Sequence, residues 1–336
     1  MMNLDDLLSE LVERKGSDLF VTVGSPPTLK VNGHLVSLGG EALDKKGALT
    51  LVRDTLSSDH FERYIRTKEA NYAIYREALG RFRVSAFSQQ ELPGMVVRRI
   101  ETRIPTFEDL QLPKILQEVA MAKRGLVLFV GATGAGKSTT QAAMIGYRNQ
   151  HADGHILTVE DPVEFVHQHG RSLVTQREVG IDTESFDVAL KSSLRQAPDV
   201  ILIGEIRSQE TMEFALQFAE TGHLCLATLH ANNANQALDR ILHLVPQDKH
   251  RQFLFDLSFN LKAIVAQQLV PSMDGKRRCA AFEILLNTPL ITDIIRKGEM
   301  HRLKEVMTKS TELGMQTFDQ ALFSLFCAGQ IGYSEA

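Results

Sequence analysis

An eight-residue stretch near the middle of the chain has the composition and spacing of a phosphate-binding loop. In order, its residues are Gly131, Ala132, Thr133, Gly134, Ala135, Gly136, Lys137 and Ser138. Glycines let successive backbone N–H groups turn inward around an anion, a lysine at this position places its charge between the β- and γ-phosphates, and the following hydroxyl offers an oxygen to Mg²⁺. The stretch, with Thr139 after it, therefore predicts a site for ATP and Mg²⁺.

The sequence on either side of this loop supports the same interpretation. The apolar residues 126–130 predict a buried strand, and residues 139–147 predict a helix. A phosphate-binding loop needs this strand–loop–helix context. The alternative, a glycine-rich turn that binds nothing, does not require it.

Acidic residues follow a second predicted strand, residues 155–159. Glu160, Asp161 and Glu164 lie within five residues of one another, around Pro162. A carboxylate one water away from a γ-phosphate can orient and deprotonate that water, and Glu164 is our candidate for this role. Taken alone, the segment is equally consistent with a solvated acidic turn.

Two more polar groups follow predicted strands. Residues 200–203 form an apolar run that leads into Gly204 and Glu205, as in a Walker B element, so Glu205 is expected to hold Mg²⁺ together with Ser138. The next run, residues 224–229, ends at His230, where an imidazole could respond to the γ-phosphate. The alternative for Glu205 is a strand that happens to end in an acid, and the alternative for His230 is a purely structural histidine. His223, just before the same apolar run, is equally consistent with a functional and a structural role.

The runs that precede these groups predict how the fold positions them. Strands that alternate with amphipathic helices indicate an α/β domain with a mostly parallel sheet covered on both faces. Ligands of such sheets bind beyond the carboxyl ends of the strands, which is where all the candidate groups fall. The spacing of Leu254, Leu257, Leu261 and Ile264, and then of Phe318, Leu322 and Leu325, predicts helices in the last hundred residues.

Residues 1–100 have a different pattern, typical of a small α+β domain. An apolar stripe from Leu4 to Val12 predicts a helix, and strands are expected at residues 18–23, 29–38, 72–75, 81–87 and 95–100. Asn32-Gly33 predicts a hairpin turn, Gly80 and Pro93-Gly94 predict two further turns, and residues 43–66 read as helical. Residues 101–113, bounded by prolines, are expected to link this domain to the second, residues 114–336.

Bulk composition excludes several classes of function. A net charge of −4 and a pI near 6.3 do not favour binding to nucleic acid. No stretch is long and apolar enough to span a membrane, and the start lacks the features of a secretion signal, so we expect a cytoplasmic protein. The three cysteines, Cys225, Cys279 and Cys327, form no CxxC motif, which gives no support for a zinc site.

Together these motifs resemble those of the secretion ATPase superfamily, specifically the PilT/PilU family of type IV pilus retraction ATPases. That family has a Walker A loop, matched by residues 131–138, and an acidic "Asp box", matched by residues 158–164. Its Walker B element ends in Gly-Glu, matched by Gly204-Glu205, and a "His box" is matched by residues 223–230. The resemblance extends over nearly the whole chain and preserves the order of the motifs.

The resemblance implies a PAS-like N-terminal domain and a RecA-like ATPase domain followed by C-terminal helices, assembled as a homo-hexamer. It also implies that basic residues of the small domain complete the site, and Arg81, Arg83 and Arg98 match the family's stretches. Arginine suits this role because its planar guanidinium pairs with phosphate oxygens and keeps its charge.

Three features place the chain within the family. Residues 267–276 run directly into a predicted strand at 278–285, where related assembly and secretion ATPases insert a four-cysteine zinc module. Residues 294–299 and 314–322 resemble the PilU branch more than PilT. The chain has Ser208 where the family's Walker B stretch normally continues to an acid, and Ala197 where the run before that stretch often reads Gln-Asp-Pro-Asp. These departures remove charge beside the site and bear on the rate of hydrolysis more than on ATP binding.

The resemblance leaves the function open between a motor and an accessory. As a motor, the hexamer would hydrolyse ATP and pull on an inner-membrane pilus platform protein, associating peripherally with the pilus machine. As an accessory, it would bind ATP, turn it over slowly and dock on a PilT-like partner ATPase. A nucleic-acid translocase is a third reading, which the acidic balance of the chain disfavours.

Overall fold

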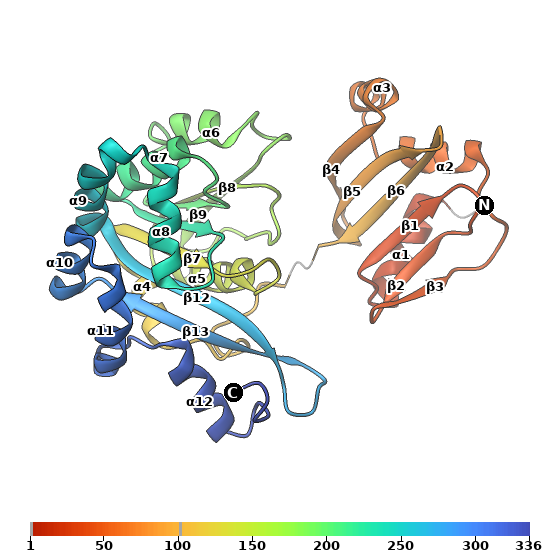
Figure 1. Cartoon of the computed structure of the whole chain (residues 1–336). Helices are drawn as coiled ribbons and strands as arrows, with labels where there is room; N and C mark the ends of the chain where they lie inside the picture. Colours follow the sequence, from red (N-terminus) through yellow and green to blue (C-terminus); the bar gives the residue numbers. More distant parts are fainter. Residues whose placement is uncertain (1–2, 101–102) are drawn as a thin grey trace. The chain divides into compact units, whose positions relative to one another are not determined.

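The computed structural model describes residues 3–100 and 103–336, so Glu101 and Thr102 of the expected linker lie outside the described residues. The chain divides into two compact units, Met1–Arg103 and Ile104–Ala336 (Figure 1). Phe107 and Leu112, from the second half of the expected linker, are buried in a core of the second unit.

The first unit contains a six-stranded antiparallel sheet in the order β3-β2-β1-β6-β5-β4. Its elements, in chain order, are α1 (Leu4–Glu13), β1 (Asp18–Thr22), β2 (Thr28–Val31), β3 (His34–Ser37), α2 (Lys45–Arg53), α3 (Ser58–Thr67), β4 (Glu69–Arg76), β5 (Gly80–Gln89) and β6 (Leu92–Arg99). Four leucines of α1 are buried against the sheet, as the apolar stripe predicts.

Two of the turns predicted for this unit have different outcomes. The Asn32-Gly33 hairpin is confirmed: both residues have positive φ, 52° and 84°, and join β2 to β3. The prediction of a turn at Pro93-Gly94 is wrong, because both residues lie inside β6 and the turn occurs at residues 90–91. Proline is tolerated there because the pairing of β6 with β1 begins only at Gly94, so Pro93 has no ladder partner on that side.

The second unit contains a seven-stranded sheet in the order β13-β12-β7-β11-β10-β8-β9, in which all neighbours are parallel except β12 and β13. The strands are β7 (Gly125–Val130), β8 (Gly154–Glu160), β9 (Ser172–Glu178), β10 (Val200–Ile203), β11 (Leu224–Leu229), β12 (Leu261–Pro271) and β13 (Arg278–Leu286). The predicted α/β class with a mostly parallel sheet is therefore confirmed.

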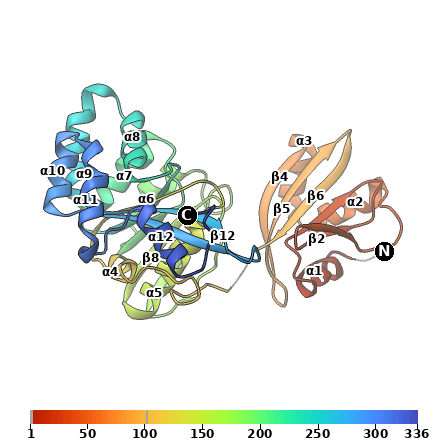
Figure 2. The same ribbon diagram turned by 60° about the horizontal axis from the view of Figure 1, so that its bottom comes forward.

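Helices cover both faces of this sheet. On one face lie α4 (Ile115–Ala120) and α5 (Lys137–His151), which are neighbours at the lower edge of Figure 2. The other face packs against α6 (Phe186–Ser193), α7 (Gln209–Glu220), α8 (Ala234–Leu244), α9 (His250–Asn260), α10 (Pro289–Lys297) and α11 (Leu303–Lys309). Helix α12 (Phe318–Cys327) contacts β13. Each face has its own apolar core, so the strands are buried on both sides.

Two strands of the second unit were not predicted, and one helix was extended too far. Leu261 and Ile264, expected on a helix with Leu254 and Leu257, lie on strand β12, because α9 ends at Asn260. All residues from Ala263 to Ala266 are buried. A short apolar run that is buried on every side has the same periodicity as a buried helix, so its pattern could not distinguish the two. Strand β9 was not predicted either.

Within the described residues, the structure has no helix that is both long and apolar enough to cross a membrane.

Candidate active site

The glycine-rich loop joins β7 to α5, and its backbone requires its glycines. Gly131, Gly134 and Gly136 have φ values of 149°, 78° and 88°, which side-chain-bearing residues rarely adopt. A Cβ atom added to Gly131 would also lie 2.4 Å from the backbone oxygen of Gln267 on β12. The loop therefore has the strand–loop–helix setting that the sequence predicts for phosphate binding.

Lys137 is buried at the start of α5, and its ammonium donates hydrogen bonds to the backbone oxygens of Gly131 and Ala132, at 2.8 and 2.9 Å. Burial lowers the pKa of Lys137, and the charges of Glu205 and Glu164 act in the opposite direction. The structure thus brings both predicted carboxylates close to the predicted lysine. An ammonium held this way inside the loop can bind a phosphate that displaces the two carbonyl oxygens.

Glu205 is positioned by two cationic or polar partners. Its Oε1 lies 3.0 Å from Nε2 of His230, and its Oε2 accepts from Arg207 at 2.6 and 2.8 Å. Arg207 also lies 3.8 Å from Asp161, so it bridges the ends of β10 and β8. The sequence predicted a role for His230 but not its contact with Glu205, and it gave no indication of Arg207.

The two histidines of β11 lie at opposite ends of the strand. His230 follows its carboxyl end, beside the loop, whereas His223 precedes its amino end. Nδ1 of His223 contacts Thr221 at 3.0 Å and the backbone oxygen of Phe218 at 3.1 Å, which ties it to the end of α7. Within this chain, His223 therefore has the structural role and His230 lies in the site.

The predicted base, Glu164, is exposed and follows the carboxyl end of β8. Glu160, at the end of that strand, is half-buried overall, but its carboxyl group is enclosed, and this desolvation raises its pKa to about 7. Its Oε1 accepts from Thr158 at 2.7 Å and from Gln176 at 3.3 Å. The sequence analysis grouped Glu160 with the acidic residues that follow the strand. In the structure it is the last residue of β8, and its carboxyl group is hydrogen-bonded to Thr158 and Gln176.

The three predicted arginines lie on one face of the first unit's sheet. Arg83 and Arg98 are direct cross-strand partners on β5 and β6, and Arg81 is two residues from Arg83. Nε of Arg98 donates to Asp18 at 2.8 Å; Arg98 is 66% exposed at its side chain and Asp18 only 7%. Contact between these arginines and a nucleotide stays a prediction.

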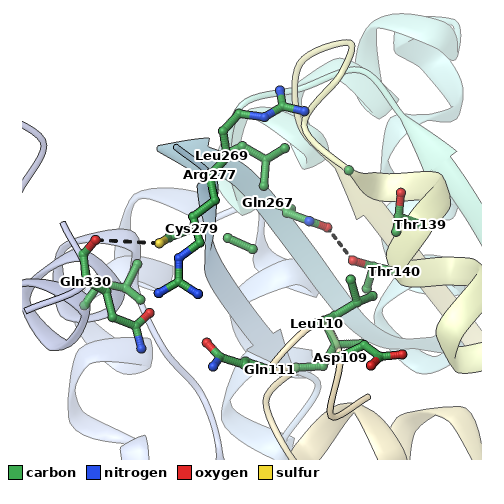
Figure 3. A pocket seen from close by; sticks show the side chains of 15 residues that line it. Asp109, Leu110, Gln111, Thr139, Thr140, Gln267, Leu269, Arg277, Cys279 and Gln330 are labelled. Carbon is green, nitrogen blue, oxygen red and sulfur yellow. Dashed lines mark hydrogen bonds between the residues drawn. The ribbon is translucent and has the colours of Figure 1, made fainter. Parts of the chain in front are cut away.

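A cavity of about 760 Å³ adjoins the loop at Gly136 and Thr139 (Figure 3). Thr139 and Thr140, in the first turn of α5, form one wall, and Arg277, Cys279 and Gln330 lie opposite. The remaining lining comes from Asp109, Leu110, Gln111, Leu112, Gln267, Leu269, Arg278, Ala280 and Leu325. The cavity is open to a ligand group that extends from the loop.

Gln267 is a site residue that sequence reasoning missed. Its Oε1 accepts a hydrogen bond from Thr140 at 2.8 Å, and a Cβ added to Gly136 would lie 2.8 Å from its Nε2. The Gln267 side chain thus lies against Gly136 of the loop and is hydrogen-bonded to the first turn of α5. The sequence could have indicated Gln267 through its position directly after the apolar residues 263–266. Burying a polar side chain in a strand costs free energy unless that side chain is hydrogen-bonded.

A second cavity, of about 460 Å³, lies on the His230 side of the loop. Gly131, Ala132 and His230 line it together with residues of α8, among them Arg240 and His243. The loop is therefore accessible from both sides.

The donor set suits Mg²⁺. Ser138 and Glu205 offer a hydroxyl and a carboxylate, which are hard oxygen ligands of the kind that Mg²⁺ prefers, and two protein ligands are typical when phosphates and water complete the shell. Ser138 is next to Lys137 in the first turn of α5, and the charge of Glu205 reaches Lys137. Both residues are thus related to Lys137, and their joint binding of Mg²⁺ stays a prediction.

Comparisons with known proteins agree with this geometry. The family model described as "Type II/IV secretion system protein" matches residues 3–310. The "Type IV pilus ATPase PilU" of Pseudomonas aeruginosa is 59% identical over 335 residues, which cover 100% of this chain and 88% of the relative. The "Type IV pilus retractation ATPase PilT" of the same organism is 37% identical, with 100% and 97% covered.

Two solved structures match nearly the whole chain. The crystal structure of the pilus retraction motor PilT with bound ADP has a TM-score of 0.94 and 36% identity, covering 100% of this chain and 96% of that one. The X-ray structure of the Legionella pneumophila ATPase DotB has a TM-score of 0.86 and 25% identity, with 99% and 94% covered.

Proposed function

We propose that this chain, which belongs to the Type II/IV secretion system protein family and within it to the PilT/PilU pilus ATPases, is a hexameric motor for retraction of type IV pili. The chain is an ATPase of this family. The observation that carries the proposal is the convergence of Lys137, Glu164, Glu205 and His230 around the glycine-rich loop.

The proposed reaction is in-line attack of water on the γ-phosphate. Glu164 orients the water and takes its proton while the new P–O bond forms and the bond to the β-phosphate oxygen breaks, which releases ADP. Lys137 exchanges its hydrogen bonds to the backbone oxygens of Gly131 and Ala132 for hydrogen bonds to phosphate oxygens. Ser138 and Glu205 would hold Mg²⁺, which neutralises charge on the phosphates when bound.

The rest of the nucleotide fits the cavity beside Thr139. Loop residues 131–138 bind the phosphates, so the ribose and base extend from Gly136 past the first turn of α5 into the space bounded by Leu269 and Gln330. Arg81, Arg83 and Arg98 then complete the site in the hexamer by contacting phosphate oxygens, as the family resemblance implies.

Family membership supports the assembly and partners included in the proposal. The proposal includes a homo-hexamer on the cytoplasmic side of the inner membrane, an inner-membrane pilus platform protein that it pulls on, and a PilT-like partner ATPase. The identity of 59% to PilU, against 37% to PilT, supports the PilU-like, accessory version of this role.

The test is ATP turnover by purified protein, with Lys137→Ala as the inactive comparison. We expect the substitution to abolish turnover, because it removes the ammonium that lies against Gly131 and Ala132 of the loop. Solution mass with a non-hydrolysable analogue should report six copies. Turnover that is the same in both proteins would refute the mechanism, and a stable mass other than six copies would refute the ring.

A second function, an ATP-binding ring with little turnover of its own, is favoured by one contact. Arg207 contacts Oε2 of Glu205 at 2.6 and 2.8 Å, so a metal ion must compete with a guanidinium for this carboxylate. Measuring turnover with and without a PilT-like partner decides between the two. A rate that rises only with the partner supports the accessory ring, and the same rate in both conditions supports the autonomous motor.

A further inference from the structure

Side chains of the neighbouring strand β9 fix the loop that carries Glu164. This loop, residues 161–167, is called the acidic loop below. Oε1 of Gln176 accepts from the backbone N–H of His167 at 2.7 Å, and Nε2 of Gln176 donates to the backbone oxygen of Phe165 at 2.8 Å. Oε2 of Glu178 accepts from the backbone N–H of Val163 at 3.2 Å. These bonds fall on both sides of Glu164.

Glu160 adds a contact to Glu164 itself. Its carboxyl group accepts a hydrogen bond from the backbone N–H of Glu164, and Nε2 of Gln176 lies 3.3 Å from its Oε1. Gln176 therefore joins the end of β8, the oxygen of Phe165 and the N–H of His167. No other side chain described above contacts the acidic loop at more than one backbone group.

The exposure of its side chains shows which residues of the acidic loop point into the protein and which point into solvent. Val163 is 1% exposed and His167 is 9% exposed, whereas Glu164 between them is exposed. The loop thus has an anchor on each side of the candidate base. Its backbone groups are held by side chains of β9 rather than by a strand ladder, so the position of Glu164 depends on those side chains.

We propose that Gln176 is a positioning residue for hydrolysis: through its paired bonds to Phe165 and His167 it holds Glu164 where it can reach the attacking water. This inference rests on the proposed function, in which Glu164 is the base. A general base is effective only within hydrogen-bond reach of the proton it removes, and a misplacement of about 1 Å costs on the order of 10²-fold in rate. The hydrogen bonds described for Gln176 go to Glu160, Phe165 and His167 and not to the glycine-rich loop or Lys137, so we expect nucleotide binding to be independent of it.

The first experiment compares the kinetics of Gln176→Met, Glu164→Gln and the double variant. Methionine has nearly the same length as glutamine but can form neither bond. We expect Gln176→Met to lower kcat about 10- to 100-fold with KM changed less than about 3-fold. In the Glu164→Gln background the same substitution should have no further effect on kcat, because residues that act as a unit are not additive.

The matched control is Leu173→Ala, on the same strand. Leu173 is 64% exposed and lies outside the contacts to the acidic loop. It should keep the wild-type kcat. A purely structural role for Gln176 would instead give losses that add fully to those of Glu164→Gln, and this result would overturn the inference.

Amide hydrogen exchange provides a readout that does not depend on activity. The N–H of His167 should exchange faster in Gln176→Met, whereas that of Val163, which Glu178 holds, should change less. Unchanged exchange at His167 would show that Gln176 does not hold the loop. Wild-type turnover in Glu164→Gln would overturn the proposed base, whereas a slow Glu164→Gln with a fast Gln176→Met would overturn the positioning role alone.

Discussion

His230 Nε2 lies 3.0 Å from Glu205 Oε1, across the carboxyl ends of the neighbouring parallel strands β11 and β10. The contact joins two groups that the sequence places 25 residues apart. The charge of Glu205 also acts on Lys137, so this one carboxylate links the predicted phosphate-binding lysine to His230. Histidine and carboxylate thus form one unit at the edge of the sheet.

Replacing His230 should therefore impair the chemical step more than binding. In His230→Ala, Glu205 loses one of its two partners and is less well oriented, so we expect kcat to fall about 10- to 100-fold while the affinity for ATP changes little. Steady-state turnover beside fluorescent-nucleotide titration measures both. The comparison is His223→Ala, at the other end of β11, which should retain nearly normal kcat. Equal losses in the two variants would contradict a specific role for His230.

The glycines of the loop should differ in their tolerance of alanine. Gly134 has open space around an added Cβ, so Gly134→Ala carries only the positive-φ penalty of about 1–2 kcal/mol. Gly131→Ala adds a clash with the backbone of Gln267, which cannot move aside as a flexible side chain does. We expect Gly131→Ala to abolish nucleotide binding and Gly134→Ala to weaken it. The same binding titration tests this, and equal affinities would refute it.

Glu160 predicts a pH dependence of stability. Burial raises its pKa from 4.5 to about 7, so the folded chain retains a proton that the unfolded chain releases. The stability from this group is complete below pH 4.5 and declines as the pH rises to about 7, by about 3 kcal/mol in total.

The comparison that isolates this effect is Glu160→Gln, which does not titrate. The free energy of unfolding of the wild type, minus that of the variant, should fall between pH 4.5 and 7 and then level off. Denaturant titrations across pH 4 to 9 provide the measurement. A difference that is constant over this range would show that the carboxyl group of Glu160 is not desolvated.

The ion pair of Arg98 with Asp18 predicts a loss of stability in the first unit. Arg98→Ala leaves the buried Asp18 with only the hydroxyl of Ser17 as a described side-chain donor, so we expect a loss of about 1–2 kcal/mol. Arg83→Ala, at the facing position on β5, should cost less. If the double variant Arg98→Ala with Asp18→Asn recovers the loss, the pair is the cause; if it does not, the pair contributes little.

Sequence and structure agree best where function depends on local backbone chemistry. Residues 131–138 had to follow a strand and precede a helix, and β7 and α5 lie on either side of them. Glu205 and His230 were predicted from their positions after apolar runs, because parallel strands bring their carboxyl ends to one edge. The hairpin at Asn32-Gly33 was equally local.

The failures have a common cause in long-range packing. β12 was taken for a helix, since a strand buried on both faces has no alternation to show. Pro93 was placed in a turn, because the sequence does not show that β1 leaves this end of β6 unpaired.

By itself, the sequence determined the phosphate-binding loop, the identity of the charged groups and the α/β class, because each depends on residue type and short spacing. Only the tertiary structure decided that Arg207 engages Glu205 and that Gln267 supports the loop. It alone also placed Gln176 against the backbone of Phe165 and His167, in the loop that carries Glu164. Gln267 contacts a helix residue 127 positions away, and Gln176 contacts the loop that precedes its own strand, so these hydrogen bonds exist only once the sheet order and register bring the segments together. Arg207 is only two residues from Glu205, but its contact depends on how the chain turns after β10.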